Sequence, residues 1–257
     1  MQRVFKNGRL IYYRQEADAG HWDRVWERQD TKVIYADAQK GSLGHFEEIF
    51  PKHLPKQGKI LEAGCGLGQL VIALRVRGYD AEGVDYAEQT IRKLRSMFPE
   101  IPFRVGDVTH LEDPDGKYIG YISLGVVEHV ESGPDPFLRE AHRLLGSGGI
   151  ACISVPYLNV LRRLKVKLGL FSTGKVHDPF YQYAFSSNEF SKILRKFGFE
   201  LINTYQYSGY KGVKDEMPFI TKIFKWPQGW RLQKWLMNSR WVARHNGHMM
   251  LYVVRKI

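Results

Sequence analysis

The sequence has little cysteine and no long apolar stretch. Only two residues are cysteine, Cys65 and Cys152, and their separation does not match a metal-ligand spacing. This usage fits a reducing, cytoplasmic environment. No run of about 18 apolar residues occurs, so no membrane span is predicted. Residues 1–15 lack the apolar centre of a secretory signal, and none is expected.

Acidic residues are also scarce. Against 38 Lys and Arg stand 27 Asp and Glu, which gives a formal net charge of +11. A basic excess concentrates anions near a protein surface, so nucleic acid, an acidic substrate and an anionic membrane are all candidate partners. The same charge can serve solubility alone. The length of 257 residues and the hydrophobic content of 44% suit one globular domain with insertions.

A glycine-rich turn lies between a predicted buried strand at 59–63 and a predicted helix at 69–77. Glycines at 64, 66 and 68 allow positive φ and close approach to a ligand, and the helix directs unpaired N–H groups into the same space. A dinucleotide fingerprint would carry glycine where Gln69 stands. The turn therefore predicts a nucleotide-type site, although a tight loop without a ligand gives the same pattern.

Acids stand at the ends of the next two predicted strands. Asp85 ends the segment 79–85, and Asp107 follows the strand at 102–106. An acid about 20 residues past the glycines is placed to accept ribose hydroxyls. Ligands of open α/β sheets bind where the carboxyl ends of the strands meet, so these strand ends predict one binding edge. For Asp85, capping of the next helix is the alternative.

Short apolar runs alternate with helical stripes from residue 58 to 155, which is typical of βαβ units and a parallel sheet. Strands are expected at 59–63, 80–84, 102–105, 118–124, 148–155, 199–207 and 247–254. Helices are expected at 44–50, 69–77, 87–98, 134–145 and 186–197.

Five segments together resemble the class I S-adenosylmethionine-dependent methyltransferases, in particular the small-molecule branch that includes ubiquinone-pathway O-methyltransferases. They are ILEAGCGLGQ (60–69), EGVDYAEQT (82–90), FRVGDV (103–108), ISLGVVEHV (122–130) and FLREAHRLLGSGGIACISVP (137–156). The resemblance implies a Rossmann-like, doubly wound, seven-stranded and mostly parallel sheet with an antiparallel last strand. It also implies S-adenosylmethionine as cofactor, S-adenosylhomocysteine as product, and in-line methyl transfer to a small or lipid-linked acceptor, at oxygen.

The same resemblance implies a cofactor role for eleven residues. Glu62 would hold the turn and reach the amino group, the turn at Gly64, Cys65, Gly66 and Gly68 would take the methionine moiety, and Asp85 would accept the ribose hydroxyls. Tyr86 would cover the adenine, Asp107 and Val108 would bind its edge, and Leu124 and Gly125 would line the sulfonium.

His129 follows the predicted fourth strand and is the candidate general base, which is needed only if the acceptor atom carries a proton. A hydrogen bond to a neighbouring loop is the alternative role. Some relatives bind a divalent metal here through E-x-x-E-H. In this chain Gly125 replaces the first acid and leaves only Glu128 and His129. Two ligands seldom hold Mg²⁺, so no metal is predicted.

We expect a single domain overall, with an N-terminal helical cap at 1–57 and a methyltransferase domain at 58–257. The cap would close over the cofactor. Within it, Trp22 and Trp26 stand at i, i+4 and either line the pocket or pack on the sheet edge.

Lid insertions are expected at 157–184 and 208–244, and their aromatic and basic residues suit a large apolar or anionic acceptor. The basic amphipathic segment 158–171 either lies peripherally on an anionic membrane or packs into the core with a solvated basic face.

Two other functions stay open. An RNA-modifying methyltransferase of the same fold is favoured by the charge and the tryptophans, but strand four ends in SLGVVEH and no RNA-binding module is visible, so nucleic acid is the less favoured partner. A catalytically silent cofactor-binding scaffold is the other, because a fold alone does not establish turnover. The sequence makes no prediction of oligomeric state.

Overall fold

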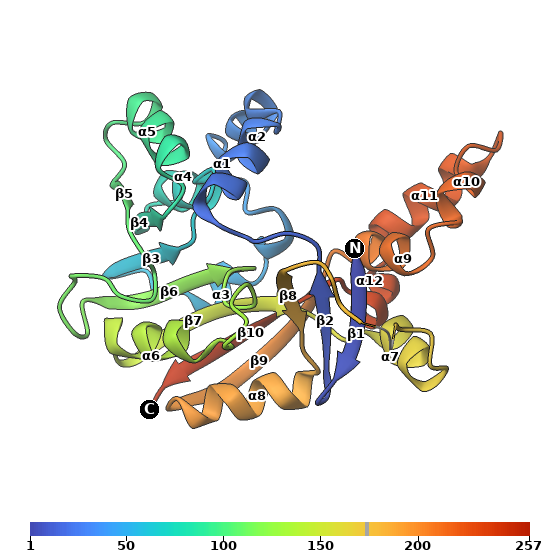
Figure 1. The fold of residues 1–257 in the computed structure, drawn as a ribbon. Coiled ribbons are helices and arrows are strands. Elements are labelled where there is room, and N and C mark those ends of the chain that lie inside the picture. The colour runs from blue at the N-terminus through green and yellow to red at the C-terminus, as the bar shows by residue number, and fades with distance from the viewer. Residues whose placement is uncertain (173–174) are drawn as a thin grey trace.

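The computed structural model describes residues 1–172 and 175–257, which form an α/β fold around a seven-stranded sheet (Figure 1). The strands are β3 (Lys59–Ala63), β4 (Asp80–Asp85), β5 (Phe103–Val105), β6 (Tyr118–Leu124), β7 (Leu145–Pro156), β9 (Phe199–Tyr207) and β10 (Met249–Lys256). Their order is β5-β4-β3-β6-β7-β10-β9. β10 pairs antiparallel with both neighbours, and the pairs from β5 to β7 are parallel. The predicted Rossmann-like sheet is confirmed.

Alternate residues of the central strands enter two separate cores. Leu61 and Tyr121 belong to the apolar cluster on one face, and Ile60 and Ile122 belong to the cluster on the other. Successive side chains of a strand point to opposite faces, so a sheet covered on both sides needs apolar residues at every position. This double burial explains the continuous apolar runs in the sequence.

Helices lie on both faces of the sheet, close to the predicted ranges. They are α4 (Gln69–Val76), α5 (Glu88–Met97), α6 (Asp135–Leu144) and α8 (Ser187–Lys196). The predicted helix at 44–50 is wrong. In its place stand the 3₁₀ turn η1 (Gly44–Phe46) and the short helix α3 (Phe50–His53), because Pro51 in the first turn of α3 has no N–H to continue a helix from the preceding residues.

The helical cap is wrong for the first residues of the chain. β1 (Gln2–Lys6) and β2 (Arg9–Tyr13) form a hairpin, and β2 also pairs with β8 (Phe180–Ala184) in a three-stranded sheet. Asn7 and Gly8 form the turn with φ of 53° and 81°. A two-residue hairpin turn of this kind favours Asn-Gly, so this dipeptide was the missed signal. The expected helices follow as α1 (Ala19–Glu27) and α2 (Thr31–Ala38). The domain limits stay a prediction.

The first insertion contains one helix and β8, and the second is mainly helical. α7 (Val160–Lys167) follows β7, and four helices separate β9 from β10: α9 (Gly209–Glu216), α10 (Ile220–Ile223), α11 (Gly229–Asn238) and α12 (Arg240–Asn246). They project to one side of the sheet (Figure 1). Across the described ranges, no helix is both long and apolar enough to cross a bilayer.

A buried ion cluster joins these helices to the N-terminal hairpin. The side chains of Arg162 and Glu216 are fully buried, and Arg162 Nε lies 3.0 Å from Glu216 Oε1. Arg3 and Lys165 donate to the same carboxylate at 2.7 and 3.0 Å. Burial opposes ionisation, but the cations outweigh it and hold the pKa of Glu216 below its usual range. The cluster ties the hairpin, α7 and α9 together.

Candidate functional site

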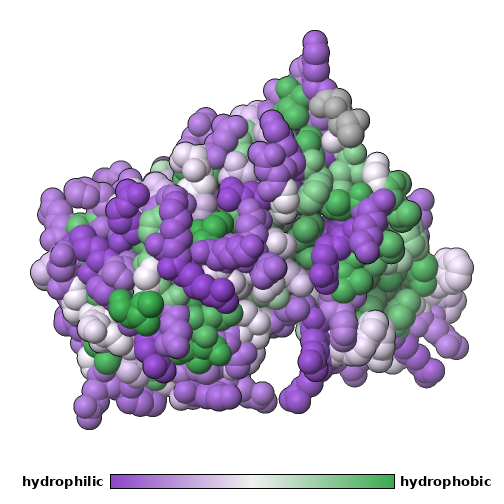
Figure 2. All heavy atoms as spheres, turned by 90° about the horizontal axis from the view of Figure 1, so that it is seen from below, coloured by the Kyte–Doolittle hydropathy of each residue, from purple (hydrophilic) through white to green (hydrophobic). Residues whose placement is uncertain are grey.

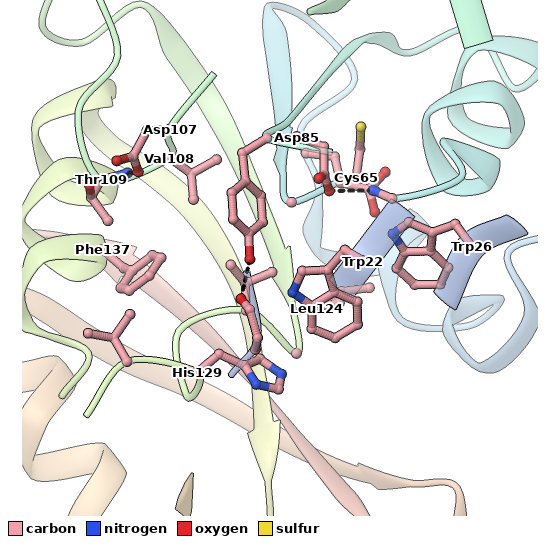
Figure 3. Close-up of a pocket in the computed structure, with 18 of the residues that line it drawn as sticks. Trp22, Trp26, Cys65, Asp85, Asp107, Val108, Thr109, Leu124, His129 and Phe137 are labelled. Atoms are coloured by element: carbon pink, nitrogen blue, oxygen red, sulfur yellow. Dashed lines mark hydrogen bonds between the residues drawn. The ribbon is translucent and has the colours of Figure 1, made fainter. Parts of the chain in front are cut away.

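A cavity of about 540 Å³ lies at the carboxyl ends of β3, β4 and β6 (Figure 3). This volume is within the range of small-molecule sites. Eleven of the twelve predicted site residues line it: Glu62, Gly64, Cys65, Gly66, Asp85, Tyr86, Asp107, Val108, Leu124, Gly125 and His129. The exception is Gly68, the N-cap of α4, where a Cβ atom would lie 2.7 Å from the Phe103 ring. Gly68 therefore makes room for core packing.

The glycine turn brings the backbone close to two walls of the cavity. Gly64 has φ of 82°, and a Cβ atom there would lie 2.4 Å from Val126 Cγ2. At Gly66, with φ of 51°, a Cβ atom would lie 2.8 Å from the Trp26 ring. Side chains at these positions would be strained in the backbone and would clash. Packing against Val126 and Trp26 therefore requires glycine at these two positions, in addition to any requirement that a ligand sets.

Asp85 holds the turn against the end of β4. Its Oδ2 atom accepts a hydrogen bond from the Gly66 N–H at 2.8 Å, and its Oδ1 atom accepts one from the Ala87 N–H at 2.9 Å. The side chain is buried, and burial raises the pKa of Asp85 although both N–H groups oppose the shift. Each carboxylate oxygen has a second acceptor site. The Asp85 carboxylate can therefore accept the hydrogen bonds from Gly66 and Ala87 and still accept the predicted ones from the ribose hydroxyls.

Glu62 offers an unused acceptor beside the turn. Its side chain is buried, and its Oε2 atom has no hydrogen-bond partner among the described residues. Burial, with a smaller contribution from the Asp85 carboxylate, raises the pKa of Glu62 to about 8. A buried carboxyl oxygen without a partner is costly, and a cationic ligand group would satisfy it. The residues present therefore fit the amino group of S-adenosylmethionine.

Two further polar groups border the cavity near the ends of β4 and β5. Asp107 Oδ1 accepts hydrogen bonds from the backbone N–H and the hydroxyl of Thr109, both at 2.8 Å. Tyr86 Oη donates to the Ala17 carbonyl at 2.6 Å, so its ring spans from β4 to the N-terminal segment. Burial raises the pKa of Tyr86 to about 12, and the phenol stays protonated.

His129 is held by a backbone carbonyl. Its Nδ1 atom lies 2.9 Å from the Tyr181 oxygen, and because a carbonyl only accepts, we assign the ring proton to Nδ1 and a lone pair to Nε2. The rings of Trp22 and Tyr181 each lie 5.1 Å away, edge on. Burial lowers the pKa of His129 to about 4. The ring is therefore neutral near pH 7 and combines a structural bond with a free acceptor.

Glu128 does not line the cavity. Its side chain is buried beneath Gly125, where a Cβ atom would lie 3.4 Å from Oε1. The same oxygen lies 3.9 Å from His129 Nε2, and burial raises the pKa of Glu128 to about 8. Within the described ranges, no three His, Cys, Asp or Glu side chains are grouped to hold a metal ion. The prediction of no metal stays a prediction.

Several lining residues were missed or left open. Trp22 and Trp26 stack at 5.6 Å and form one wall, whereas Asp107 and Thr109 lie across the cavity from them (Figure 3). The i, i+4 spacing of the two tryptophans was compatible with two arrangements, in which they either line the pocket or pack on the edge of the sheet. Thr109 follows Asp107 by two residues, the separation of an Asx turn, and could have been found from it. No sequence pattern indicated that Phe137, on α6, would line the cavity.

The sheet order and a cavity at the strand ends define a Rossmann-like ligand-binding protein. Residues 38–204 match the family model described as a methyltransferase domain, which is more than half of the chain, and the chain belongs to that family.

Individual relatives agree with this membership. A Mycolicibacterium smegmatis protein named as a probable S-adenosylmethionine-dependent methyltransferase is 29% identical over 147 residues, 56% of this chain and 53% of that protein. The ubiquinone biosynthesis O-methyltransferase of Azorhizobium caulinodans is 31% identical over 125 residues, 44% and 49% of the two chains. The chain thus spans about half the length of the curated relatives it matches.

A solved structure shares the fold across nearly the whole chain. It is 1,6-didemethyltoxoflavin-N1-methyltransferase of Burkholderia thailandensis, which holds S-adenosylhomocysteine in that crystal. The TM-score is 0.53 at 17% identity, with 100% of this chain and 99% of that chain covered. Together the matches confirm the predicted methyltransferase family, in which the named relatives depend on S-adenosylmethionine, and the solved structure agrees with the predicted fold.

Proposed function

We propose that this chain transfers the methyl group of S-adenosylmethionine to an oxygen of a small or lipid-linked acceptor, by in-line displacement. The observation that carries the proposal is that one cavity has a carboxyl without a partner, Glu62, beside the glycine turn and a neutral histidine, His129, on its wall. The first suits a cationic cofactor. The second suits an acceptor that must lose a proton.

The cofactor supplies an electrophilic methyl group when it is bound. Glu62 and the turn at Gly64 to Gly66 would hold its methionine end, Asp85 its ribose, and Asp107, Val108 and Tyr86 its adenine, with Leu124 and Gly125 at the sulfonium. Support comes from the shared lining of one cavity by all of these residues. Methyl transfer then depends chiefly on alignment of the acceptor and on exclusion of water.

His129 would take the acceptor proton at Nε2 while Tyr181 keeps the other ring nitrogen protonated. Its low pKa makes the resting ring a weak base. Glu128 Oε1 lies 3.9 Å from Nε2, and because burial raises the pKa of Glu128 to about 8, this carboxyl releases its own proton to solvent only above that pH. The resulting carboxylate would then stabilise the His129 ring after it has taken the acceptor proton.

The acceptor itself would have an apolar body. Val126, Val130, Pro136 and Phe137 line the cavity along with the indole of Trp22. Such walls favour an aromatic ring or a prenyl-like chain over a sugar, because burial of apolar surface stabilises the complex and unpaired hydroxyls would weaken it. The resemblance to a ubiquinone biosynthesis O-methyltransferase supports a phenolic hydroxyl.

The test begins with calorimetric titration of the protein with S-adenosylmethionine and S-adenosylhomocysteine. Methyl transfer to phenolic and lipid-linked acceptors is then measured for the wild type, His129→Ala and His129→Asn. We expect turnover to fall about 10²-fold or more in both variants with cofactor affinity unchanged.

Three results would change the assignment. Little loss of turnover returns His129 to a structural role. Cofactor binding without turnover on any acceptor favours the silent scaffold, and no cofactor binding by the wild type overturns the proposal.

A further inference from the structure

The helices between β9 and β10 leave four tryptophans in solvent. Trp226, Trp230, Trp235 and Trp241 are between 55% and 69% exposed, and Phe219 and Met237 are exposed to a similar degree. The other two tryptophans of the chain line the cavity. Large aromatic side chains are mostly buried in proteins, and clusters of exposed ones mark interaction surfaces. We call residues 219–241 the tryptophan arm.

The arm carries positive charge that is almost entirely unpaired. Residues 219–241 contain five bases and no acid: Lys222, Lys225, Arg231, Lys234 and Arg240. Of these, only Arg240 forms an ion pair with an acid within the described ranges, at 3.6 Å from Glu48 on the surface. The preceding acids are occupied elsewhere, since Asp215 pairs with Lys211 and Glu216 with Arg162. The surface therefore attracts anions.

On α11 the aromatic and basic side chains share one face. Trp230, Arg231, Lys234 and Trp235 are spaced so that the two bases lie between the two indoles. A shallow groove of about 480 Å³ is lined by these four residues together with Asn238 and Ser239. The opposite face buries Leu236 against Val213 and Val242. The helix thus has its own small core, and the exposed face is not needed to build it.

α7 extends the surface with aliphatic side chains. Leu161 packs on the same small core, while Leu164, Leu168 and Leu170 are between 50% and 63% exposed. In Figure 2, which is seen from below, hydrophobic side chains gather on the right, the side on which α7 lies in Figure 1, with hydrophilic ones among them. α7 buries Arg162 but exposes Arg163 and Lys167 together with these leucines, so its exposed face is both basic and aliphatic.

We propose that the tryptophan arm docks on a bilayer surface that contains anionic phospholipids. Indole rings favour the headgroup level of a bilayer, and bases beside them gain from the negative surface potential. Exposed aliphatic side chains enter the boundary of the acyl region. RNA would engage the bases and indoles but would leave Leu168, Leu170 and Met237 unused. The inference goes beyond methyl transfer and does not depend on it.

The test is co-sedimentation with phosphatidylcholine vesicles, with and without phosphatidylglycerol. We expect binding to the anionic vesicles and little to pure phosphatidylcholine. Arg231→Gln with Lys234→Gln should weaken binding about thirtyfold, because each base near the surface contributes about fivefold. Trp230→Ala with Trp235→Ala should weaken it at least about tenfold. All variants should keep their affinity for S-adenosylhomocysteine, which shows that they are folded.

Matched controls change exposed residues far from the arm. Lys40→Gln and Met97→Ala should leave vesicle binding within about twofold, since the two side chains are 77% and 54% exposed on other elements. Absence of binding by the folded wild type, or equal binding by the arm variants, overturns the proposal. So does stronger retention on an RNA homopolymer than on anionic vesicles, or dimerisation that the tryptophan variant abolishes.

Discussion

The parallel half of the sheet and the tryptophan arm use apolar residues in opposite ways. Ile60 and Leu61 of β3 are fully buried, as are their neighbours on β6, whereas Trp226 on the arm is 69% exposed. In the parallel half of the sheet, an apolar run recurs at each strand, and acids follow at the carboxyl ends of these strands. In the tryptophan arm, the apolar residues of α11 are divided between a small core and solvent. Burial alone therefore explains the first region and only part of the second.

The largest expected effect concerns the buried ion cluster that connects the insertions to the hairpin, because there charged rather than apolar side chains are buried. Glu216→Ala leaves Arg162 buried without its carboxylate, so the free energy of unfolding should fall by about 3–5 kcal/mol. Urea unfolding followed by circular dichroism measures it. Glu88→Ala is the matched control, because its ion pair with Arg92 is exposed on both sides and should cost at most about 1 kcal/mol. Equal losses in the two variants would mean that the cluster is not a special anchor.

A smaller effect, on ligand affinity, tests the edge of the sheet. Asp85→Ala should weaken S-adenosylmethionine binding by about 1–3 kcal/mol, because ribose hydroxyls and the Gly66 N–H lose their acceptor. Asp80→Ala alters the opposite end of the same strand, where the carboxylate pairs with Arg75, and should not change affinity. Calorimetry of both variants measures the difference. Unchanged affinity in Asp85→Ala would remove the ribose assignment.

The smallest expected effect is on the pH dependence of cofactor affinity, through the ionisation of Glu62. With a pKa of about 8, this carboxyl is mostly protonated near pH 7, and a cationic amino group beside it favours ionisation. Binding should then release a proton, so affinity rises with pH up to about pH 8, above which the ligand's own α-amino group also loses its proton.

The readout is the cofactor dissociation constant over about two pH units below that pKa, together with proton release measured in two buffers. Glu62→Gln should bind with no slope and no proton release. A wild-type affinity that is flat across this window would contradict a contact between Glu62 and the amino group.

Local patterns predicted most of the sheet and the acids and glycines at its edge, because Asp85, Asp107 and the glycine turn stand at fixed offsets from strand ends. The family resemblance added the other residues that were predicted to line the cavity, and about half of the lining was not predicted. What they could not predict depends on distant packing. Arg162 sits in a basic segment that suggests solvent exposure, and its burial requires Glu216, which is 54 residues away. The low pKa of His129 likewise comes from burial, which the rings of Trp22 and Tyr181 provide from distant parts of the chain, although the Tyr181 carbonyl opposes the shift. By contrast, the Asn7-Gly8 hairpin was visible in the sequence and was overlooked.

The hairpin has a kinetic consequence. β2 is joined to β8, Tyr181 of β8 holds His129, and Ala17 just beyond β2 holds Tyr86. The segments that cover the cavity are thereby linked to one another across more than 160 residues of sequence. Ligand exchange then requires these links to open together, and such collective motions occur on microsecond to millisecond timescales. We expect one gating step, shared by cofactor entry and product release, to limit how fast the cavity can be refilled.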